Sequence, residues 1–399
     1  DGIRGDMRKI NHMPFDALNL PKPAHPIGLG ATPEGITQNP AYYAFLYEQA
    51  FEDKPQVALT DHVIAMAHRR YGIDPQDDWQ EEIVQSWSLL LNSLYSTDRS
   101  VQDGTGVAHW NNRRISDGSS LFEKDRYTPT AMLCQVFTAW EYLVKAATKS
   151  KQDNGRWHTS SSFRYDVINL GREVLAQLST PVALNFSESI AADPIHPDAV
   201  TQSGNFYQSL LLDLDSLVGT EKSFHLSRWL RSARQWGRST DDCILPAETI
   251  NNESNKTRCE VFYEWNARSQ VTTWNPTLAN ATSIPGGPID YAAKHWHGLI
   301  REYYVKRIAL VQDQALEDAV KHQTLNQTKV DWLLAQHAYE WTLLESFKSH
   351  IDDHQVTVDR SMGDYIDVSR TMLQKYQMWF RGSCPAQEFL GMNKGSVKR

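Results

Sequence analysis

The stretch Pro26-Ile-Gly-Leu-Gly-Ala-Thr-Pro-Glu-Gly-Ile-Thr-Gln-Asn-Pro-Ala-Tyr-Tyr43 decides the fold class of this chain. Its first five residues form a short apolar run that predicts a strand, and residues 39–51 predict a helix. Glu34 lies between the two, and a (β/α) barrel places its catalytic carboxylates at the C-terminal ends of strands. Pro33 and Glu34 are also typical of a first helical turn, so the residues alone leave both roles open.

Composition limits the function classes. The chain has 399 residues, enough for two or more domains, and contains no apolar run long enough to span a membrane. Its formal net charge of −8 argues against nucleic acid and against anionic membranes as partners. The 13 Trp and 16 Tyr are typical of carbohydrate-processing proteins, because sugar faces stack on aromatic rings, but a Trp-rich helical core is the better explanation for most of them.

Beyond the opening stretch, the apolar spacing is almost entirely that of amphipathic helices. Further helices are predicted over residues 57–71, 79–95, 130–148, 163–178, 206–218, 224–236, 291–310, 330–347 and 365–380. Residues 96–120 and 181–203 are predicted as loops because they are rich in Gly, Ser, Asp and Pro. No fixed repeat period is found, which disfavours a solenoid.

We therefore predict a mostly α fold, in which the end of a (β/α)8 barrel precedes a large all-helical C-terminal domain. Residues 1–55 are assigned to the barrel and residues 56–399 to the helical domain. Residues 1–25 are expected to be turn-rich without a long helix, because several prolines interrupt them. The chain opens without Met or a signal pattern, as an internal piece of a longer protein would.

Cysteines and glycosylation sequons give weak information about the compartment. The four cysteines form no Cys-x-x-Cys pair; Cys243 and Cys259 could close a disulfide or remain free thiols. Residues 251–257 are predicted as a loop. Candidate N-glycosylation sites, weakly favouring the secretory route, are Asn185, Asn252, Asn255, Asn280 and Asn326.

Several ordered motifs resemble one enzyme family. The Glu34 segment is similar to the nucleophile segment of the α-N-acetylglucosaminidases (glycoside hydrolase family 89), which reads roughly Gly-x-x-x-Glu-Gly-Ile-x-Gln-Asn before a Tyr-containing helix. Other matching segments are Ala67-His-Arg-Arg-Tyr-Gly72, Trp87-Ser-Leu-Leu-Leu-Asn-Ser-Leu-Tyr95, Phe163-Arg-Tyr-Asp-Val-Ile-Asn-Leu170, Glu264-Trp-Asn-Ala-Arg-Ser-Gln-Val-Thr-Thr-Trp274 and Ile289-Asp-Tyr-Ala-Ala-Lys-His-Trp-His-Gly-Leu299. They extend over most of the chain in the family's order, which makes the resemblance specific.

The resemblance implies a lysosomal or secreted exo-glycosidase that releases terminal α-linked N-acetylglucosamine, in animals from heparan sulfate. It implies a retaining mechanism with two carboxyl groups about 5 Å apart. Glu34 matches the nucleophile, and Trp274 and Tyr291 match aromatic residues that border the sugar pocket. The loop over residues 275–288 is longer than the family's and carries a sequon, so this chain departs from the family at the pocket rim.

The acid/base carboxyl group has no match before Glu34, where the only acids are Asp1, Asp6 and Asp16. The chain is therefore expected to be inactive alone. One alternative is a non-catalytic helical scaffold or carbohydrate-binding remnant that kept the Glu34 segment by descent. Another is a helical-toroid glycosidase or lyase, which we rank last because the strand before Glu34 has no place in a toroid.

No cofactor or metal is predicted, and a glycan is the expected partner. His295 and His297 are predicted to lie in a helix, where side chains two residues apart point in different directions. His350 and His354 could share a helix face, but a solvated helix end explains them better. The oligomeric state stays open, and a homo-oligomer is compatible with the sequence.

Overall fold

Helices make up most of the part of the chain that the computed structural model describes. It describes residues 3, 5–21, 24, 26–31, 39–73, 80–97, 107, 130–240, 255–272, 292, 294–344 and 362–383, with the backbone alone for some residues at the edges of these ranges. The helices are α1 (Met7–Leu18), α2 (Pro40–Glu48), α3 (Leu59–Tyr71), α4 (Gln80–Asn92), α5 (Thr130–Gln152), α6 (Ser161–Ala191), α7 (Pro197–Val218), α8 (Leu226–Arg238), α9 (Asn255–Gln270), α11 (Val305–Val320), α12 (Gln327–Tyr339) and α14 (Tyr365–Ser383). Short elements are the paired strands β1 (Gly5–Asp6) and β2 (Ser96–Thr97), the 3-10 turns Gln49–Phe51, Trp157–Thr159 and Lys222–Phe224, and the π-helical turns Ile300–Tyr304 and Glu340–Leu344.

The chain divides into two compact units, and the division falls inside α6. Unit 1 comprises Asp1–Gln102, Thr128–Val174 and Asp364–Arg399, and unit 2 comprises Asp103–Tyr127 and Leu175–Gly363. The helical part of the predicted fold class is confirmed. The barrel assigned to residues 1–55 and the domain boundary near residue 55 stay predictions.

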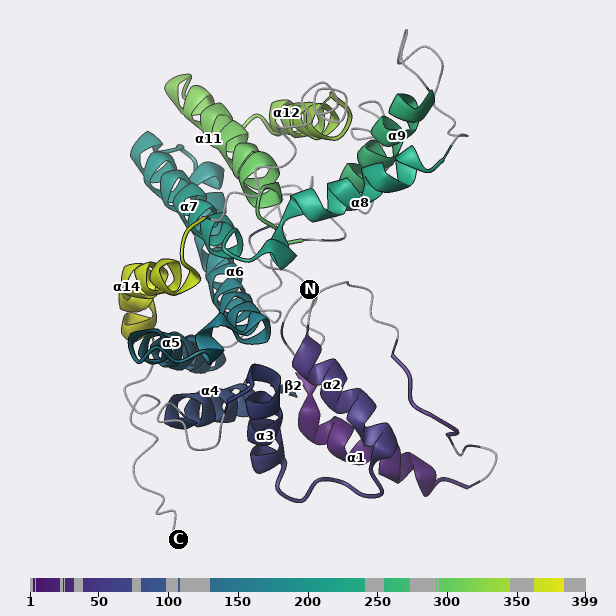
Figure 1. The fold of residues 1–399 in the computed structure, drawn as a ribbon. Helices are drawn as coiled ribbons and strands as arrows, with labels where there is room; N and C mark the ends of the chain where they lie inside the picture. The colour runs from purple at the N-terminus through teal and green to yellow at the C-terminus, as the bar shows by residue number, and fades with distance from the viewer. Residues whose placement is uncertain are drawn as a thin grey trace. The chain divides into compact units, whose positions relative to one another are not determined.

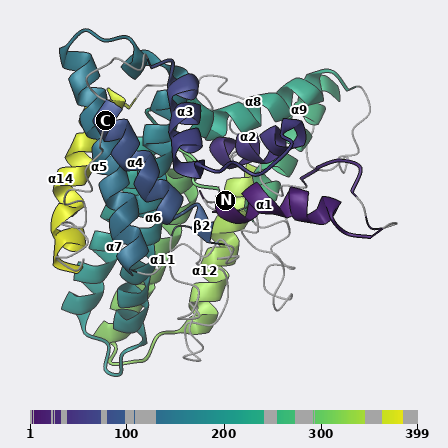
Figure 2. The same ribbon diagram turned by 90° about the horizontal axis from the view of Figure 1, so that it is seen from below.

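Unit 1 is built around aromatic side chains that α3, α4, α5 and α14 bury between them. In Figures 1 and 2, α14 lies against α5, and α5 lies against α4. Phe137 of α5 stacks on Phe380 of α14 with ring centroids 4.2 Å apart, and both side chains are buried. Large aromatics bury the most apolar surface per residue, so these contacts contribute strongly to the stability of the unit.

Unit 2 contains two close helix pairs. Figure 1 shows α7 beside α11 and α8 beside α9. The buried side of α7 carries Leu210, Leu211 and Leu214 at helical spacing, as its apolar periodicity predicts. Among the helices with described residues, none combines the length and apolar character needed to cross a bilayer.

The predicted strand over residues 26–30 is wrong. These residues are irregular, and Ile27 is fully exposed. A strand needs a neighbour to accept and donate its backbone hydrogen bonds, and no strand among the described residues lies beside this stretch. Two glycines within five residues weaken it further.

The expectation that prolines exclude a long helix near the N-terminus is also wrong. α1 continues through Pro14 because other contacts hold it. The Asp6 carboxylate caps it by accepting from the Lys9 N–H at 2.9 Å. Buried Asn11 exchanges two hydrogen bonds with the backbone of Gln56, at 3.0 and 2.8 Å. Together these oppose the cost of a helix-internal proline, about 3 kcal/mol.

Two predicted loops contain helix. α6 runs through Pro181 to Ala191, and α7 already begins at Pro197, although residues 181–203 are predicted as a loop. The continuation buries Val182, Phe186 and Ile190, and this burial outweighs the hydrogen bond that Pro181 cannot donate. Likewise α9 begins at Asn255, inside the stretch 251–257 predicted as a loop.

The close packing of α8 against α9 at Gly237 can be tested directly by substitution. A Cβ added at Gly237 of α8 would lie 2.7 Å from backbone atoms of Cys259 and Glu260 in α9, so the helices must separate. We expect Gly237→Ala to destabilise the chain by about 1–3 kcal/mol, measured by urea unfolding. Gly28→Ala, where no atom lies within 4 Å, is the control and should change stability by less than about 1 kcal/mol. Equal stability of the two variants would contradict this close approach.

Candidate functional site

The three residues predicted for the sugar site, Glu34, Trp274 and Tyr291, lie outside the described residues. The structure describes the segment that follows or precedes each of them. The first described residue after Glu34 is Asn39, the last before Trp274 is Thr272, and the first unbroken described run after Tyr291 begins at Lys294. The candidate site is described from these segments.

The segment that follows Glu34 ends on a buried hydrogen bond. Asn39 precedes α2, whose first residue is Pro40, a residue preorganised for a first helical position. The Asn39 side chain is buried, and its Oδ1 accepts from the Tyr95 hydroxyl at 3.0 Å. Burial raises the pKa of Tyr95 far above its usual range, so the hydroxyl stays a donor at every physiological pH. The end of the Glu34 segment is thereby fixed to the residues after α4.

Tyr95 belongs to a chain of buried aromatic rings. It stacks on Trp87, with centroids 6.2 Å apart and planes 4° apart. The Trp87 indole N–H donates to the Tyr71 hydroxyl at 3.1 Å, and Tyr71 meets the edge of Phe163 at 5.0 Å. These four rings come from three segments that are distant in sequence, and packing them together leaves Tyr95 little freedom to move.

An ion pair holds the same cluster on its polar side. Arg70 of α3 donates to Asp166 of α6 through Nε at 2.7 Å and Nη2 at 2.9 Å, a bidentate arrangement. Burial would lower the pKa of Arg70, but the hydrogen bond and charge of Asp166 outweigh it and raise the pKa. The segments around Glu34, Arg70, Trp87 and Phe163 resemble the family independently in sequence, and the described residues of all four meet here.

A second paired carboxylate, that of Glu264, fixes the segment before Trp274. Glu264 of α9 is fully buried between Arg234 of α8 and Arg268, whose Nε donates to it at 2.9 Å. The Arg268 guanidinium also lies over the Trp341 ring, 4.7 Å from its centroid. Thr272, two residues before Trp274, is buried and donates from Oγ1 to the Arg268 carbonyl at 2.7 Å.

Residues 294–298 are not helical, so the predicted helix over residues 291–310 begins too early and the helical placement of His295 and His297 is wrong; the helix is confirmed from Ile300 to Leu310. His297 pairs with residues 224–226 as a short parallel bridge: its N–H donates to the Phe224 carbonyl at 2.8 Å, and its carbonyl accepts from Leu226 at 3.1 Å. Gly298 then takes a positive φ of 89°, which breaks the extended run, and the helix starts only after it.

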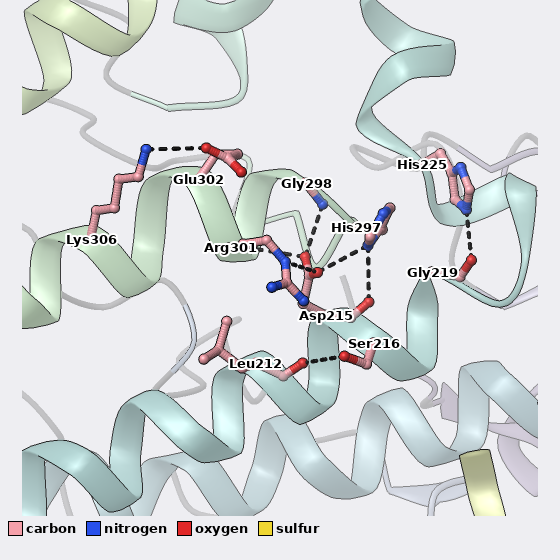
Figure 3. Close-up of polar contacts among 10 residues, drawn as sticks. All are labelled: Leu212, Asp215, Ser216, Gly219, His225, His297, Gly298, Arg301, Glu302 and Lys306. Carbon is pink, nitrogen blue, oxygen red and sulfur yellow. Dashed lines mark hydrogen bonds and ion pairs between the residues drawn. The ribbon is translucent and has the colours of Figure 1, made fainter. Parts of the chain in front are cut away.

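Sequence reasoning missed Asp215, a fully buried acid that contacts the residues around His297. It lies in the last turn of α7 and is fully buried (Figure 3). Its carboxylate accepts from the Gly298 N–H at 2.8 Å, the Arg301 N–H at 3.3 Å and Arg301 Nε at 3.0 Å, and His297 Nδ1 lies 3.0 Å away. The signal in the sequence was a lone acid on the apolar face of a helix, which is unusual unless the charge is paired.

The structure describes some of the other candidates from the sequence, and the rest lie outside its described residues. Asn185 is exposed on α6, and exposed Asn326 caps α12 by accepting from the Lys329 N–H at 3.0 Å. Asn252, Asn280, His350 and His354 lie outside the described residues, as does the side chain of Asn255. No cluster of three or more potential metal ligands occurs within the described ranges. Cys134 and Cys259 are both disulfide-bonded, which excludes a free thiol at Cys259; Cys243 lies outside the described residues.

Comparison with known proteins identifies relatives of this chain. Residues 63–375 match the family described as the alpha-N-acetylglucosaminidase (NAGLU) C-terminal domain. The chain is 26% identical over 385 residues to alpha-N-acetylglucosaminidase of Homo sapiens, covering 96% of this chain and 44% of the human protein.

Solved structures show the same fold. A family 89 glycoside hydrolase of Clostridium perfringens, in complex with its substrate GlcNAc-α-1,4-galactose, superposes with a TM-score of 0.70 at 18% identity, covering 95% of this chain and 38% of that one. A complex described as the Clostridium perfringens family 89 glycoside hydrolase with PUGNAc gives a TM-score of 0.67 at 19% identity, covering 94% and 38%. The chain thus spans less than half the length of these relatives.

The Tyr95–Asn39 bond can be tested by removing one oxygen atom. Tyr95→Phe keeps the ring stack but takes this donor from buried Asn39, so we expect a loss of about 1–3 kcal/mol in the free energy of unfolding. Tyr47→Phe on α2 is the matched control, because Tyr47 is 46% exposed; it should change stability by less than about 0.5 kcal/mol. Urea unfolding of both variants measures this, and a neutral Tyr95→Phe would remove the proposed anchor of the Glu34 segment.

Proposed function

The chain belongs to the alpha-N-acetylglucosaminidase C-terminal domain family. From this premise we propose that it is part of a retaining exo-glycosidase that releases terminal α-linked N-acetylglucosamine. In this proposal Glu34 is the nucleophile: its ionised carboxylate attacks the anomeric carbon and forms a glycosyl ester, which water then hydrolyses. Trp274 stacks on the sugar ring and Tyr291 hydrogen-bonds a sugar hydroxyl. Glycans such as heparan sulfate are the proposed natural substrates.

One observation supports this proposal: residues of four segments that resemble the family pack together, and Asn39, from the Glu34 segment, is hydrogen-bonded to this cluster. A nucleophile must be held close to its attack geometry, because misplacement by about 1 Å can cost 100-fold in rate. Asn39 lies five residues after Glu34 and is tied by the Tyr95 hydroxyl to a rigid aromatic cluster. A segment without a catalytic role would not need so buried an anchor as Asn39, and this favours catalysis over a non-catalytic scaffold.

The mechanism needs a second carboxyl group as acid and then base. Asp6 is occupied as the helix cap of α1, and neither Asp1 nor Asp16 resembles the family's acid/base segment. We propose that this group comes from polypeptide beyond these 399 residues and that the chain alone does not hydrolyse glycosides.

A lysosomal or secreted location is proposed with this function. Disulfides persist in oxidising compartments, and both Cys134 and Cys259 are disulfide-bonded. Sequon residues Asn185 and Asn326 are exposed, so a glycan is sterically allowed at both.

The nucleophile assignment is tested in a polypeptide that carries both carboxyl groups. Glu34→Gln should lower kcat/KM on an aryl α-N-acetylglucosaminide by at least about 1,000-fold, because the neutral amide cannot attack the anomeric carbon. NMR of the first-formed sugar should show the α anomer, and a fluorosugar inactivator should label Glu34.

Glu48→Gln is the matched control for this test. Glu48 lies on α2 and is partly exposed, pairing with His62 at 3.0 Å, so activity should change by less than about threefold. If Glu34→Gln keeps full activity, or if the label attaches elsewhere, Glu34 is not the nucleophile. Absence of any hydrolysis or labelling in the unmodified polypeptide would favour the non-catalytic alternative.

Glycosylation at Asn326 can be tested without disturbing the helix cap. The cap uses Oδ1, whereas a glycan is attached through Nδ2, so modification and capping are compatible. In a eukaryotic secretory host, Thr328→Ala should remove one endoglycosidase-sensitive glycan by intact mass, whereas Thr328→Ser should retain it. Identical glycan masses for the two variants would exclude this site.

A further inference from the structure

Asp215 and His297 join two helix ends that carry opposite partial charges. The Asp215 carboxylate accepts from Gly298 and Arg301 N–H groups, at the N-terminal end of the helix that continues into α11. The His297 ring approaches the last turn of α7, with Nδ1 3.1 Å from the Asp215 carbonyl. An anion at a helix N-terminus and a cation at a helix C-terminus are each stabilised by the helix dipole.

The geometry determines which nitrogen of His297 carries a proton. Nδ1 lies within hydrogen-bonding distance of two acceptors, the carboxylate and the carbonyl of Asp215, so it must be the donor (Figure 3). Titration therefore occurs at Nε2. Above its pKa, His297 keeps the Nδ1 hydrogen bond but loses its charge; below it, the same bond becomes a charged pair.

The His297 ring packs closely against the C-terminal end of α7. A Cβ on Gly219, the residue that ends α7, would lie 2.7 Å from His297 Nδ1 and 2.6 Å from Met362 Cγ. His225 lies on another side, with its ring centroid 5.0 Å from that of His297, and its Nε2 donates to the Gly219 carbonyl at 3.0 Å. The close approach of His297 to α7 is thus built into the backbone.

We propose that Asp215 and His297 form an acid-strengthened latch that positions residues 294–298, which come shortly after Tyr291 in the sequence. The latch is formed by the two side chains and by the His297 bridge to residues 224–226. Its catalytic consequence rests on the proposed pocket role of Tyr291. Asp215 and His297 are positioning residues, since neither is proposed to touch the sugar.

The charged groups around His297 determine the pH range over which the latch is stabilising. Among the described residues, Asp215 favours its charged form, Arg301 opposes it, and His225 is the third titratable neighbour. Burial alone would lower the pKa of His297, but the hydrogen bond and charge of Asp215 outweigh this and raise it. Burial would raise the pKa of Asp215, and His297, Gly298 and Arg301 together lower it.

The directions of these two pKa shifts determine how the stability contributed by the latch changes with pH. A raised histidine pKa adds stability that is complete below the unfolded value of about 6.5 and is lost as pH rises through the folded value. A lowered aspartate pKa adds stability that is complete above about 3.9 and is lost as pH falls through the folded value. The latch is therefore strongest between about pH 4 and pH 6.5, the range of an acidic compartment.

The experiment titrates His297 in the intact 399-residue chain by NMR of histidine-labelled protein, with His297→Gln to assign its signal. We expect a midpoint above the ordinary value of about 6.5, falling by at least about one pH unit in the isosteric variant Asp215→Asn. An ordinary midpoint that Asp215→Asn leaves unchanged would overturn the latch.

Hydrogen exchange then tests positioning in the same chain. After correction for intrinsic rates, peptides covering residues 292–304 should exchange about 10-fold faster in His297→Gln than in the unmodified chain at pH 5.5, with a smaller ratio at pH 8. Peptides of α14 should not change. His12→Gln, at an exposed position of α1, is the control and should leave residues 292–304 unaffected. Uniform acceleration across the chain would show a general loss of stability and overturn the positioning role.

The link to catalysis has a separate readout in the hydrolytically active polypeptide. His297→Gln should raise KM more than it lowers kcat, and more at pH 5 than at pH 7. An unchanged pH profile would overturn the catalytic consequence while leaving the glycosidase function intact. Absence of hydrolysis in the unmodified polypeptide would refute the proposed function, and the NMR and exchange results would still decide the latch.

Discussion

A carboxylate removed from water must be surrounded by donors, and this requirement organises the polar interior of both units. Asp166, which is largely shielded from water, and the fully buried Asp215 and Glu264 each meet it with donors from another helix or segment of the chain. Arg70 reaches Asp166 from α3, Arg234 reaches Glu264 from α8, and the Asp215 donors come from beyond residue 296. Each carboxylate therefore fixes one particular pairing of segments. Apolar contacts tolerate sliding, whereas a bidentate or four-contact carboxylate does not.

Helix positions were predictable where the sequence carried both periodicity and an end signal. α3 ends at Tyr71 because Gly72 adopts the left-handed conformation that the Gly predicts. Helices that run through proline were not predictable. At Pro14 and Pro181 the local preference for a break is overcome by burial and by a pair such as Asn11 with Gln56, and neither can be read from neighbouring residues.

The candidate site was predictable where motif residues bond to one another. Tyr71, Trp87 and Asp166 belong to segments singled out in the sequence, and they form one cluster. Asp215 could not be found in this way, because its partners lie more than 80 residues further along the chain. Nor could the extended course of His297, since the same residues read as an amphipathic helix until the bridge to residues 224–226 takes their backbone groups.

Buried ion pairs are weak stabilisers, since desolvating two charges costs nearly as much as their attraction returns. Their value here lies in position. The proposed pocket residues Trp274 and Tyr291 lie, in sequence, between two described segments, one ending at Thr272 and one beginning at Lys294. Arg268 and Thr272 fix the end of the first segment through Glu264, and His297 fixes the start of the second through Asp215. The chain therefore enters and leaves the part that carries both proposed residues at positions set by two buried carboxylates.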